Sequence, residues 1–191
     1  MTAPLQLTHP PRQGEAERDI RYTPAWCTEA LLDVCPPPTG QPVLDPAAGD
    51  GAILRVLRMR GYDVQWCEIR EEEAEGLMAI GWGCVGDWLS VRHRPGPWSI
   101  VTNPPYSIGP AFMTACLATQ PDYCAALLRL NHLGSASWLS LWRKHPPSGL
   151  LVLGSRRPSF SADGKTDASE YVWVVWQSGC SVNGMTWMEW R

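Results

Sequence analysis

Short apolar runs alternate with amphipathic segments along most of this chain, and this alternation limits its fold more than any other feature. The runs predicted as strands are 43–45, 63–69, 83–87, 98–103, 123–130, 149–154 and 171–176, and the predicted helices are 23–34, 52–60, 71–80, 112–119 and 135–145. Such alternation is typical of a parallel sheet with helices on both faces. The last run, YVWVVW, follows no convincing helical pattern, so we expect it to be antiparallel and near the sheet edge. The prediction is an α/β fold: one doubly wound, Rossmann-like domain with a mostly parallel sheet and one antiparallel strand.

Length and composition favour a single domain. The chain has 191 residues, of which 45% are hydrophobic and 18% charged, which suffices for one core and is too apolar for a disordered chain. Residues 1–21 are polar and rich in proline, so we expect a loose N-terminal arm followed by a domain over 22–191. The first helix is expected to have Thr23 as its N-cap and Pro24 at its first position.

Cysteine usage and hydropathy indicate a soluble protein of a reducing compartment. The seven cysteines form no C-x-x-C pair, and several lie inside apolar runs, which argues against a disulfide framework and a zinc site. The N-terminus lacks the features of a signal peptide, and six prolines interrupt the charge-free stretch 95–121. We therefore expect a cytoplasmic protein without a metal and without membrane association.

Charge is distributed unevenly although the formal net charge is only −3. Residues 88–162 contain one acid, Asp122, and seven basic residues. This middle segment could face a polyanion, or its basic side chains could simply be scattered over a solvated surface.

The turn after the first predicted strand reads Asp45-Pro-Ala47-Ala-Gly49-Asp-Gly51. A strand that ends in Gly-x-Gly and leads into a helix lets a ligand approach the backbone near the positive helix N-terminus. A dinucleotide site needs a third glycine, and Leu54 stands at that position. A tight turn without a ligand is the alternative.

Acidic residues also end the next two strands. Glu68 is placed to accept hydrogen bonds from both hydroxyls of a ribose, although it could equally serve the N-terminus of the acidic helix 71–80. Asp87 could accept from an adenine amino group while the Trp88 indole packs on the ring, or the two could form an ordinary strand-end turn.

The fourth predicted strand ends in Asn103-Pro104-Pro105-Tyr106, the most specific motif in the chain. Two consecutive prolines fix two φ angles, so the carbonyl of Pro104 is held rigidly beside the Asn103 side-chain carbonyl. Two adjacent acceptors fit one –NH₂ group, and Tyr106 offers a flat face on which a ring carrying that group can stack. A purely structural turn has no need of Asn before the prolines and Tyr after them.

The succession DPAAGDG, CEIRE, VGDW and TNPPYS resembles the S-adenosylmethionine-dependent methyltransferases that act on amino groups. Among them it is most similar to DNA N6-adenine methyltransferases of the small phage and prophage type. The resemblance extends over about 22–179 and implies a methyltransferase domain, S-adenosylmethionine as cofactor and DNA as partner, in a bacterial or phage-infected cell.

The resemblance also implies roles for individual residues. The methionine part of the cofactor would contact the residues before and after the first strand, namely Tyr22, Thr23, Asp45, Ala47, Gly49 and Gly51. Glu68 would hold the ribose, Ile69 would lie beside the adenine, Asp87 would accept from its amino group and Trp88 would line its pocket. Asn103, Pro104, Pro105 and Tyr106 would hold the substrate base, which must be flipped out or single-stranded to be reached.

The long loop 155–170 is the remaining candidate for substrate contacts. Its polar, basic and aromatic residues suit phosphate contacts plus one wedge or stacking side chain, and those named are Arg156, Arg157, Ser159, Phe160 and Lys165. We expect little sequence specificity, because no separate recognition segment is evident.

Several alternatives remain open. They are methylation of a glutamine side-chain amide in a protein, of cytosine N4 or of RNA adenine, and, from another class, a non-catalytic nucleotide-binding module. The four histidines are isolated and are expected at the surface or in caps. The less favoured alternative is that His132 lies near the base pocket. Trp138 and Trp142 are expected to pack in the core rather than stack on bases.

Overall fold

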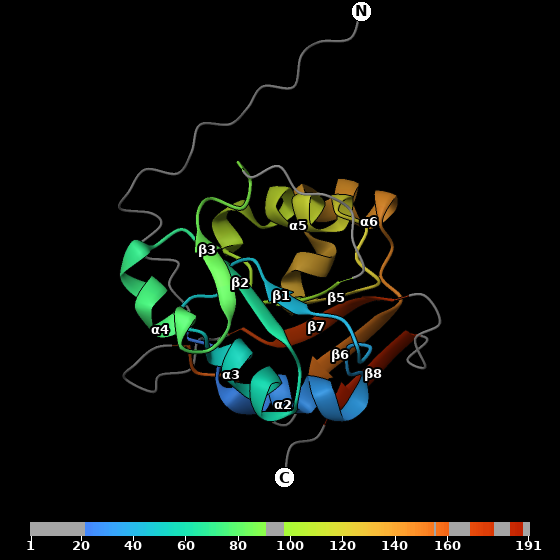
Figure 1. Ribbon diagram of the computed structural model, residues 1–191. Coiled ribbons are helices and arrows are strands. Elements are labelled where there is room, and N and C mark those ends of the chain that lie inside the picture. The colour runs from blue at the N-terminus through green and yellow to red at the C-terminus, as the bar shows by residue number, and fades with distance from the viewer. Residues whose placement is uncertain (1–21, 91–97, 155, 161–168, 178–183, 189–191) are drawn as a thin grey trace, which may run out of the picture.

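An eight-stranded sheet forms the centre of the molecule in this computed structural model (Figure 1). The structure describes residues 22–90, 98–154, 156–160, 169–177 and 184–188. The strands are β1 (Val43–Asp45), β2 (Val64–Glu68), β3 (Trp82–Val85), β4 (Ser99–Thr102), β5 (Tyr123–Arg129), β6 (Gly149–Leu153), β7 (Tyr171–Gln177) and β8 (Gly184–Met188). Their order is β3-β2-β1-β4-β5-β7-β6-β8, and only β7 is antiparallel to its neighbours β5 and β6. The predicted fold class is confirmed.

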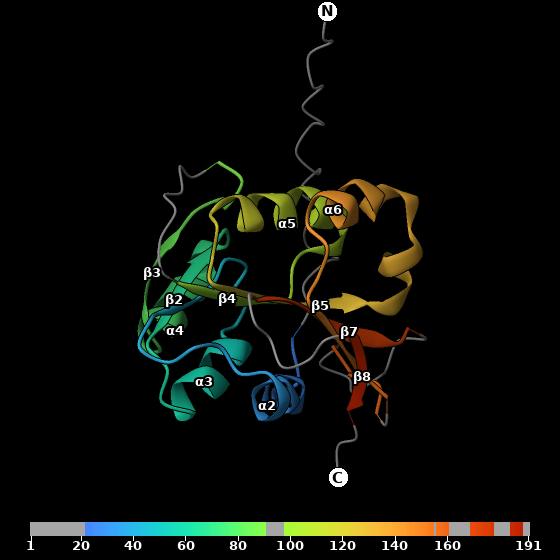
Figure 2. The ribbon, with the colours of Figure 1, turned by 90° about the vertical axis from the view of Figure 1, so that its right-hand side faces the viewer.

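Helices cover both faces of the sheet. The longer ones are α2 (Ala25–Val34), α3 (Ala52–Met59), α4 (Ala74–Met78), α5 (Gly109–Ala118) and α6 (Leu139–Lys144), with short 3₁₀ turns η2 (Glu71–Glu73), η3 (Tyr106–Ile108), η4 (Leu130–Gly134) and η5 (Ala136–Trp138). Figure 2 shows α5 and α6 on one face and α2 and α3 on the other. Among the described residues, no helix has the length and apolarity needed to cross a membrane.

Alternate side chains of the central strands pack into two separate apolar clusters. In β5, Tyr123 and Leu127 pack with the α2 and α3 side, whereas Cys124 and Leu128 pack with α5. This two-sided burial explains why β5 reads as a continuous apolar run in the sequence.

The strand order reverses at β1, which lies between β2 and β4. Such a switch point leaves a crevice at the carboxyl ends of the two central strands, where ligands of open α/β sheets bind. Asp45 ends β1 and Asn103 follows β4, so the two motifs singled out in the sequence meet at this edge.

Three details differ from the sequence prediction. Helix α2 begins at Ala25 with Pro24 in the N-cap position and no side-chain cap, so Thr23 is not the N-cap. Strand β7 lies between β5 and β6 rather than beside the edge. Strand β8 was not predicted, and it pairs with β6 in parallel. The predicted arm 1–21 lies outside the described residues.

Candidate active site

The turn between β1 and α3 is built around two glycines with positive φ, Gly49 at 58° and Gly51 at 84°. The positive φ of Gly51 favours glycine there, and a Cβ at this position would also lie 2.5 Å from Cδ1 of Ile80, whose side chain would have to shift. The Asp45 side chain holds the start of the turn, because its Oδ1 accepts a hydrogen bond from the Ala47 N–H at 3.1 Å. The turn thereby brings its backbone against the end of β2.

Burial raises the pKa of Asp45 from 3.8 to about 7. The carboxyl group is 1% exposed. A substantial fraction of the protein therefore carries a neutral Asp45 at neutral pH. A cation bound beside this side chain would favour its charged form.

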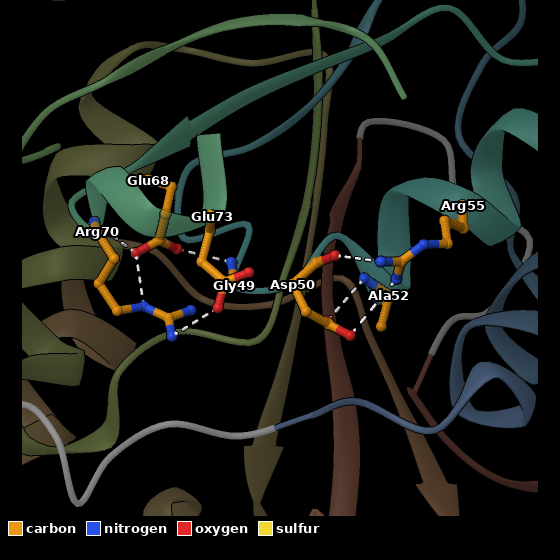
Figure 3. Close-up of polar contacts among 7 residues, drawn as sticks. All are labelled: Gly49, Asp50, Ala52, Arg55, Glu68, Arg70 and Glu73. Carbon is orange, nitrogen blue, oxygen red and sulfur yellow. Dashed lines mark hydrogen bonds and ion pairs between the residues drawn. The ribbon is translucent and has the colours of Figure 1, made fainter. Parts of the chain in front are cut away.

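Glu68 joins β2 to the glycine turn, as Figure 3 shows. Its buried carboxylate accepts the Gly49 N–H at 2.7 Å through Oε2 and the Arg70 N–H at 3.0 Å through Oε1. The Arg70 guanidinium contacts Glu68 at 3.1 Å and Glu73 at 3.0 Å. The Arg70 Nε also donates to Oε1, so three of the four lone-pair directions of the carboxylate are used and Oε2 retains one for a further donor. Ile69, the next residue, is 64% exposed and presents an apolar side chain beside this carboxylate.

Asp87 and Trp88 differ in environment. Asp87 is exposed, and its two oxygens accept from the Leu89 N–H at 3.0 Å and the Ser90 hydroxyl at 2.7 Å. The Trp88 indole is 5% exposed and packs in the α5-side core with Leu44. Trp88 is buried to the same extent as Glu68, and its place in the wall of the adenine pocket stays a prediction.

The Asn103 amide is oriented by a residue far away in the chain. Its Nδ2 donates to the Thr23 hydroxyl at 3.0 Å, whereas its Oδ1 is buried and has no hydrogen-bond partner among the described residues. Buried polar atoms are rarely left unpaired, so an orphaned acceptor indicates a missing donor. Pro104, beside it, is buried, and Pro105 has a φ of −63°.

The Tyr106 ring lies among three side chains from β5, η4 and β7. The Arg129 guanidinium is 5.3 Å from its centroid, the His132 ring 5.4 Å away at 74°, and the Tyr171 ring 6.4 Å away. The Nε of Arg129 also donates to the Tyr171 hydroxyl at 3.4 Å. Sequence reasoning missed Arg129 and gave little weight to His132. Their position directly at the end of an apolar strand was the available signal.

The position of Phe160, in the loop after β6, contradicts its predicted role as an exposed wedge. Phe160 is 4% exposed and packs on Tyr171 with ring centroids 4.7 Å apart, so it is a core residue and not an exposed wedge. Its carbonyl accepts the Tyr22 N–H at 3.3 Å, which links this loop to the segment before α2. Tyr22 itself is 41% exposed.

The two arginines of the loop are not equivalent. Arg157 pairs with Glu170 at 2.5 Å, whereas the exposed Arg156 guanidinium lies 5.5 Å from the Trp26 ring centroid. Ser159 is half-buried, and Lys165 lies outside the described residues. Arg156 is therefore the stronger candidate for contact with an anion.

Metal ligation finds no support in the described part of the chain, where no three His, Cys, Asp or Glu side chains gather as a metal site would require. The groups that do gather at the switch point suit an organic ligand: the carboxyl groups of Asp45 and Glu68, a glycine turn, and the exposed apolar side chain of Ile69.

Comparison with known proteins places the fold among methyltransferases. No family model and no curated protein sequence matches the chain. Among solved structures it is similar to the 23S rRNA methyltransferase ErmE, at 18% identity over 81% of this chain and 67% of that one, with a TM-score of 0.59. A dimethyladenosine transferase from Plasmodium falciparum is 12% identical over 80% of this chain and 61% of that one, with a TM-score of 0.58. The M protein of the type I restriction enzyme EcoKI is 16% identical over 85% of this chain and 44% of that one, with a TM-score of 0.62. The chain thus has a Rossmann-like methyltransferase fold.

Proposed function

We propose that this protein transfers a methyl group from S-adenosylmethionine to the N6 amino group of adenine in DNA. The observation that carries the proposal is the buried Oδ1 of Asn103 at the switch point, which has no partner in the described part of the chain and belongs to the turn that also contains Tyr106. The names of the structural neighbours, which include an rRNA methyltransferase and a dimethyladenosine transferase, support a nucleic-acid substrate.

The residues at the ends of β1 and β2 fit the cofactor. Glu68 would accept from the ribose hydroxyls, Ile69 would pack on the adenine, and Asp45 and Thr23 would surround the methionine part. Asp87 would contact the adenine amino group, and Tyr22, Ala47, Gly49 and Gly51 would complete the methionine site. When bound, S-adenosylmethionine supplies an electrophilic methyl group on a sulfonium.

The residues after β4 would prepare the nucleophile. An adenine amino nitrogen is weakly nucleophilic because its lone pair is delocalised into the ring. Hydrogen bonds from its two protons to Asn103 Oδ1 and the Pro104 carbonyl would favour a more tetrahedral nitrogen and stabilise the charge that develops there. Stacking on Tyr106 would orient the base for an in-line transfer. As the bond between the methyl group and nitrogen forms, the bond between the methyl group and sulfur would break, and the methylated nitrogen would pass one proton to solvent water.

A substrate comparison tests the proposal directly. Labelled cofactor is incubated with DNA, RNA or protein, and the product is digested and analysed as nucleosides or amino acids. The expected product is N6-methyladenine in DNA. Methylated glutamine, N4-methylcytosine or label confined to RNA would each contradict the proposal.

Cofactor affinity should depend on pH through Asp45. In the protein without ligand, the Asp45 carboxyl group has a pKa of about 7 and is therefore largely protonated at pH 6. It must release its proton before it can accept a hydrogen bond from the ammonium group of the ligand. The affinity for S-adenosylhomocysteine is therefore expected to rise about fivefold between pH 6 and pH 7. Titration calorimetry at both pH values measures this. Asp45→Asn should bind more weakly and without this rise, and a pH-independent affinity of the unaltered protein would contradict the role of Asp45.

DNA binding should be salt-dependent and nearly indifferent to sequence. Arg156→Ala is expected to lower the slope of log affinity against log salt by about one, and Arg157→Ala by less, because Glu170 already neutralises Arg157. Fluorescence anisotropy at several salt concentrations measures the slope. Arg60→Ala, at the end of α3 and paired with Asp33, serves as control and should leave it unchanged.

The same variants should leave the choice of adenines unchanged, since phosphate contacts carry no sequence information. Sequencing that detects N6-methyladenine on a random DNA library should show a preference of one or two flanking bases at most. A strict motif of four or more bases would show that a recognition element exists in the chain.

A further inference from the structure

His132 carries a second buried polar atom without a partner. Its Nδ1 has no hydrogen-bond partner among the described residues, a condition that it shares with Oδ1 of Asn103. The two residues adjoin the same side chain, because Asn103 precedes Tyr106 in the turn and the His132 ring packs against the Tyr106 ring. Asn103 and His132 each have an orphaned atom and are connected through Tyr106, one by the turn and the other by the ring contact, which points to one ligand with complementary groups.

The imidazole is held rigidly by tryptophans. It stacks on Trp138 at 4.9 Å and 14°, and Trp138 in turn stacks on Trp142 at 5.3 Å and 17°. The Trp142 indole N–H donates to the His132 carbonyl at 3.2 Å, which ties the backbone of η4 to the same stack. A ring fixed in this way can recognise a ligand with little loss of side-chain entropy.

The protonation state suits recognition by a neutral ring. Burial, with a smaller contribution from Arg129, lowers the pKa of His132 below 6.5. A neutral imidazole has one N–H donor and one acceptor. Adenine offers only acceptors besides its amino group, and two of them, N1 on the Watson–Crick edge and N7 on the Hoogsteen edge, lie on either side of this group.

We propose that His132 donates a hydrogen bond to N1 or N7 of the target adenine and is thus a base-recognition residue in addition to the Asn-Pro-Pro-Tyr turn. The inference rests on the proposed function. A contact to N1 would also exclude guanine, which carries a hydrogen on N1, whereas a contact to N7 would orient the base without distinguishing the two purines.

The test uses single-adenine oligonucleotides in which the target base is adenine, 1-deazaadenine or 7-deazaadenine. The unaltered protein should methylate one deaza analogue more slowly than the other. The ratio of these two rates should be about tenfold larger for the unaltered protein than for His132→Phe. Phenylalanine keeps the ring stacking and removes the N–H. His132→Asn, whose amide nitrogen can occupy the position of Nδ1, should restore part of the discrimination.

His145→Phe is a matched control. The carbonyl of His145 also accepts a tryptophan indole N–H, from Trp176 at 2.9 Å, but His145 directly follows α6, whereas His132 lies in η4. This variant should discriminate between the analogues as the unaltered protein does. Binding of S-adenosylhomocysteine verifies that each variant is folded.

The outcomes separate the two proposals. If the unaltered protein does not methylate the adenine oligonucleotide, the proposed function fails. If it does, and His132→Phe retains the full difference between the two analogues, the recognition role of His132 is overturned. Such a result would mean that a water molecule satisfies Nδ1.

Discussion

Replacement of Asn103 by alanine is expected to reduce the rate of methyl transfer about a hundredfold while leaving the affinity for S-adenosylhomocysteine nearly unchanged. The lost group is the buried Oδ1, which has no partner among the residues that the structure describes and which would accept a hydrogen bond from the substrate amino group. Removal of one preorganised hydrogen bond from a transition state costs roughly 3 kcal/mol. The measurement is single-turnover methylation of an adenine-containing oligonucleotide, with calorimetry for the ligand.

Two further variants show whether the effect comes from the acceptor itself. Thr23→Val removes the hydroxyl that holds the Asn103 Nδ2 at 3.0 Å, so the rate should fall by a smaller factor than in Asn103→Ala. Gln41→Ala removes a side-chain amide that bonds Ser99 at the opposite end of β4, and it should leave the rate unchanged. If Asn103→Ala retains more than a tenth of the activity, the assigned role of Asn103 is wrong.

The location of the site was predictable because it depends on the direction of the strands. Asp45, Glu68 and Asn103 each end or follow a strand of one parallel set, so any sheet with these strands brings their carboxyl ends to one edge. The glycine turn was equally readable, since positive φ at Gly49 and Gly51 is a local requirement.

The contacts between distant segments were not predictable. Phe160 reads as exposed in a polar loop, and its burial depends on Tyr171 at the start of β7, whose place in the sheet a single sequence does not reveal. Thr23 reads as a helix cap by its position before Pro24, but its hydroxyl bonds a residue 80 positions away. The proximity of His132 to Tyr106 likewise requires β5 to lie beside β4.

Glu68→Ala is expected to weaken S-adenosylhomocysteine binding ten- to a hundredfold. The carboxylate is buried, is held by the Gly49 N–H and by the backbone and side chain of Arg70, and has one lone-pair direction left on Oε2 for a ribose hydroxyl. Loss of charge-assisted hydrogen bonds of this kind costs roughly 1.5–3 kcal/mol, which corresponds to that range of affinity. Asp87→Ala should also weaken binding, but by less, because Asp87 is exposed and its oxygens already accept from Leu89 and Ser90.

A ligand without the ribose 2′-hydroxyl separates direct contact from an indirect effect on the turn. The unaltered protein should bind 2′-deoxy-S-adenosylhomocysteine more weakly than S-adenosylhomocysteine, whereas Glu68→Ala should bind the two alike, since the acceptor is already gone. Arg70→Ala keeps the carboxylate and removes the guanidinium that contacts it at 3.1 Å, so this variant should still distinguish the two ligands. If Glu68→Ala distinguishes them as strongly as the unaltered protein does, Glu68 supports the glycine turn and does not hold the ribose.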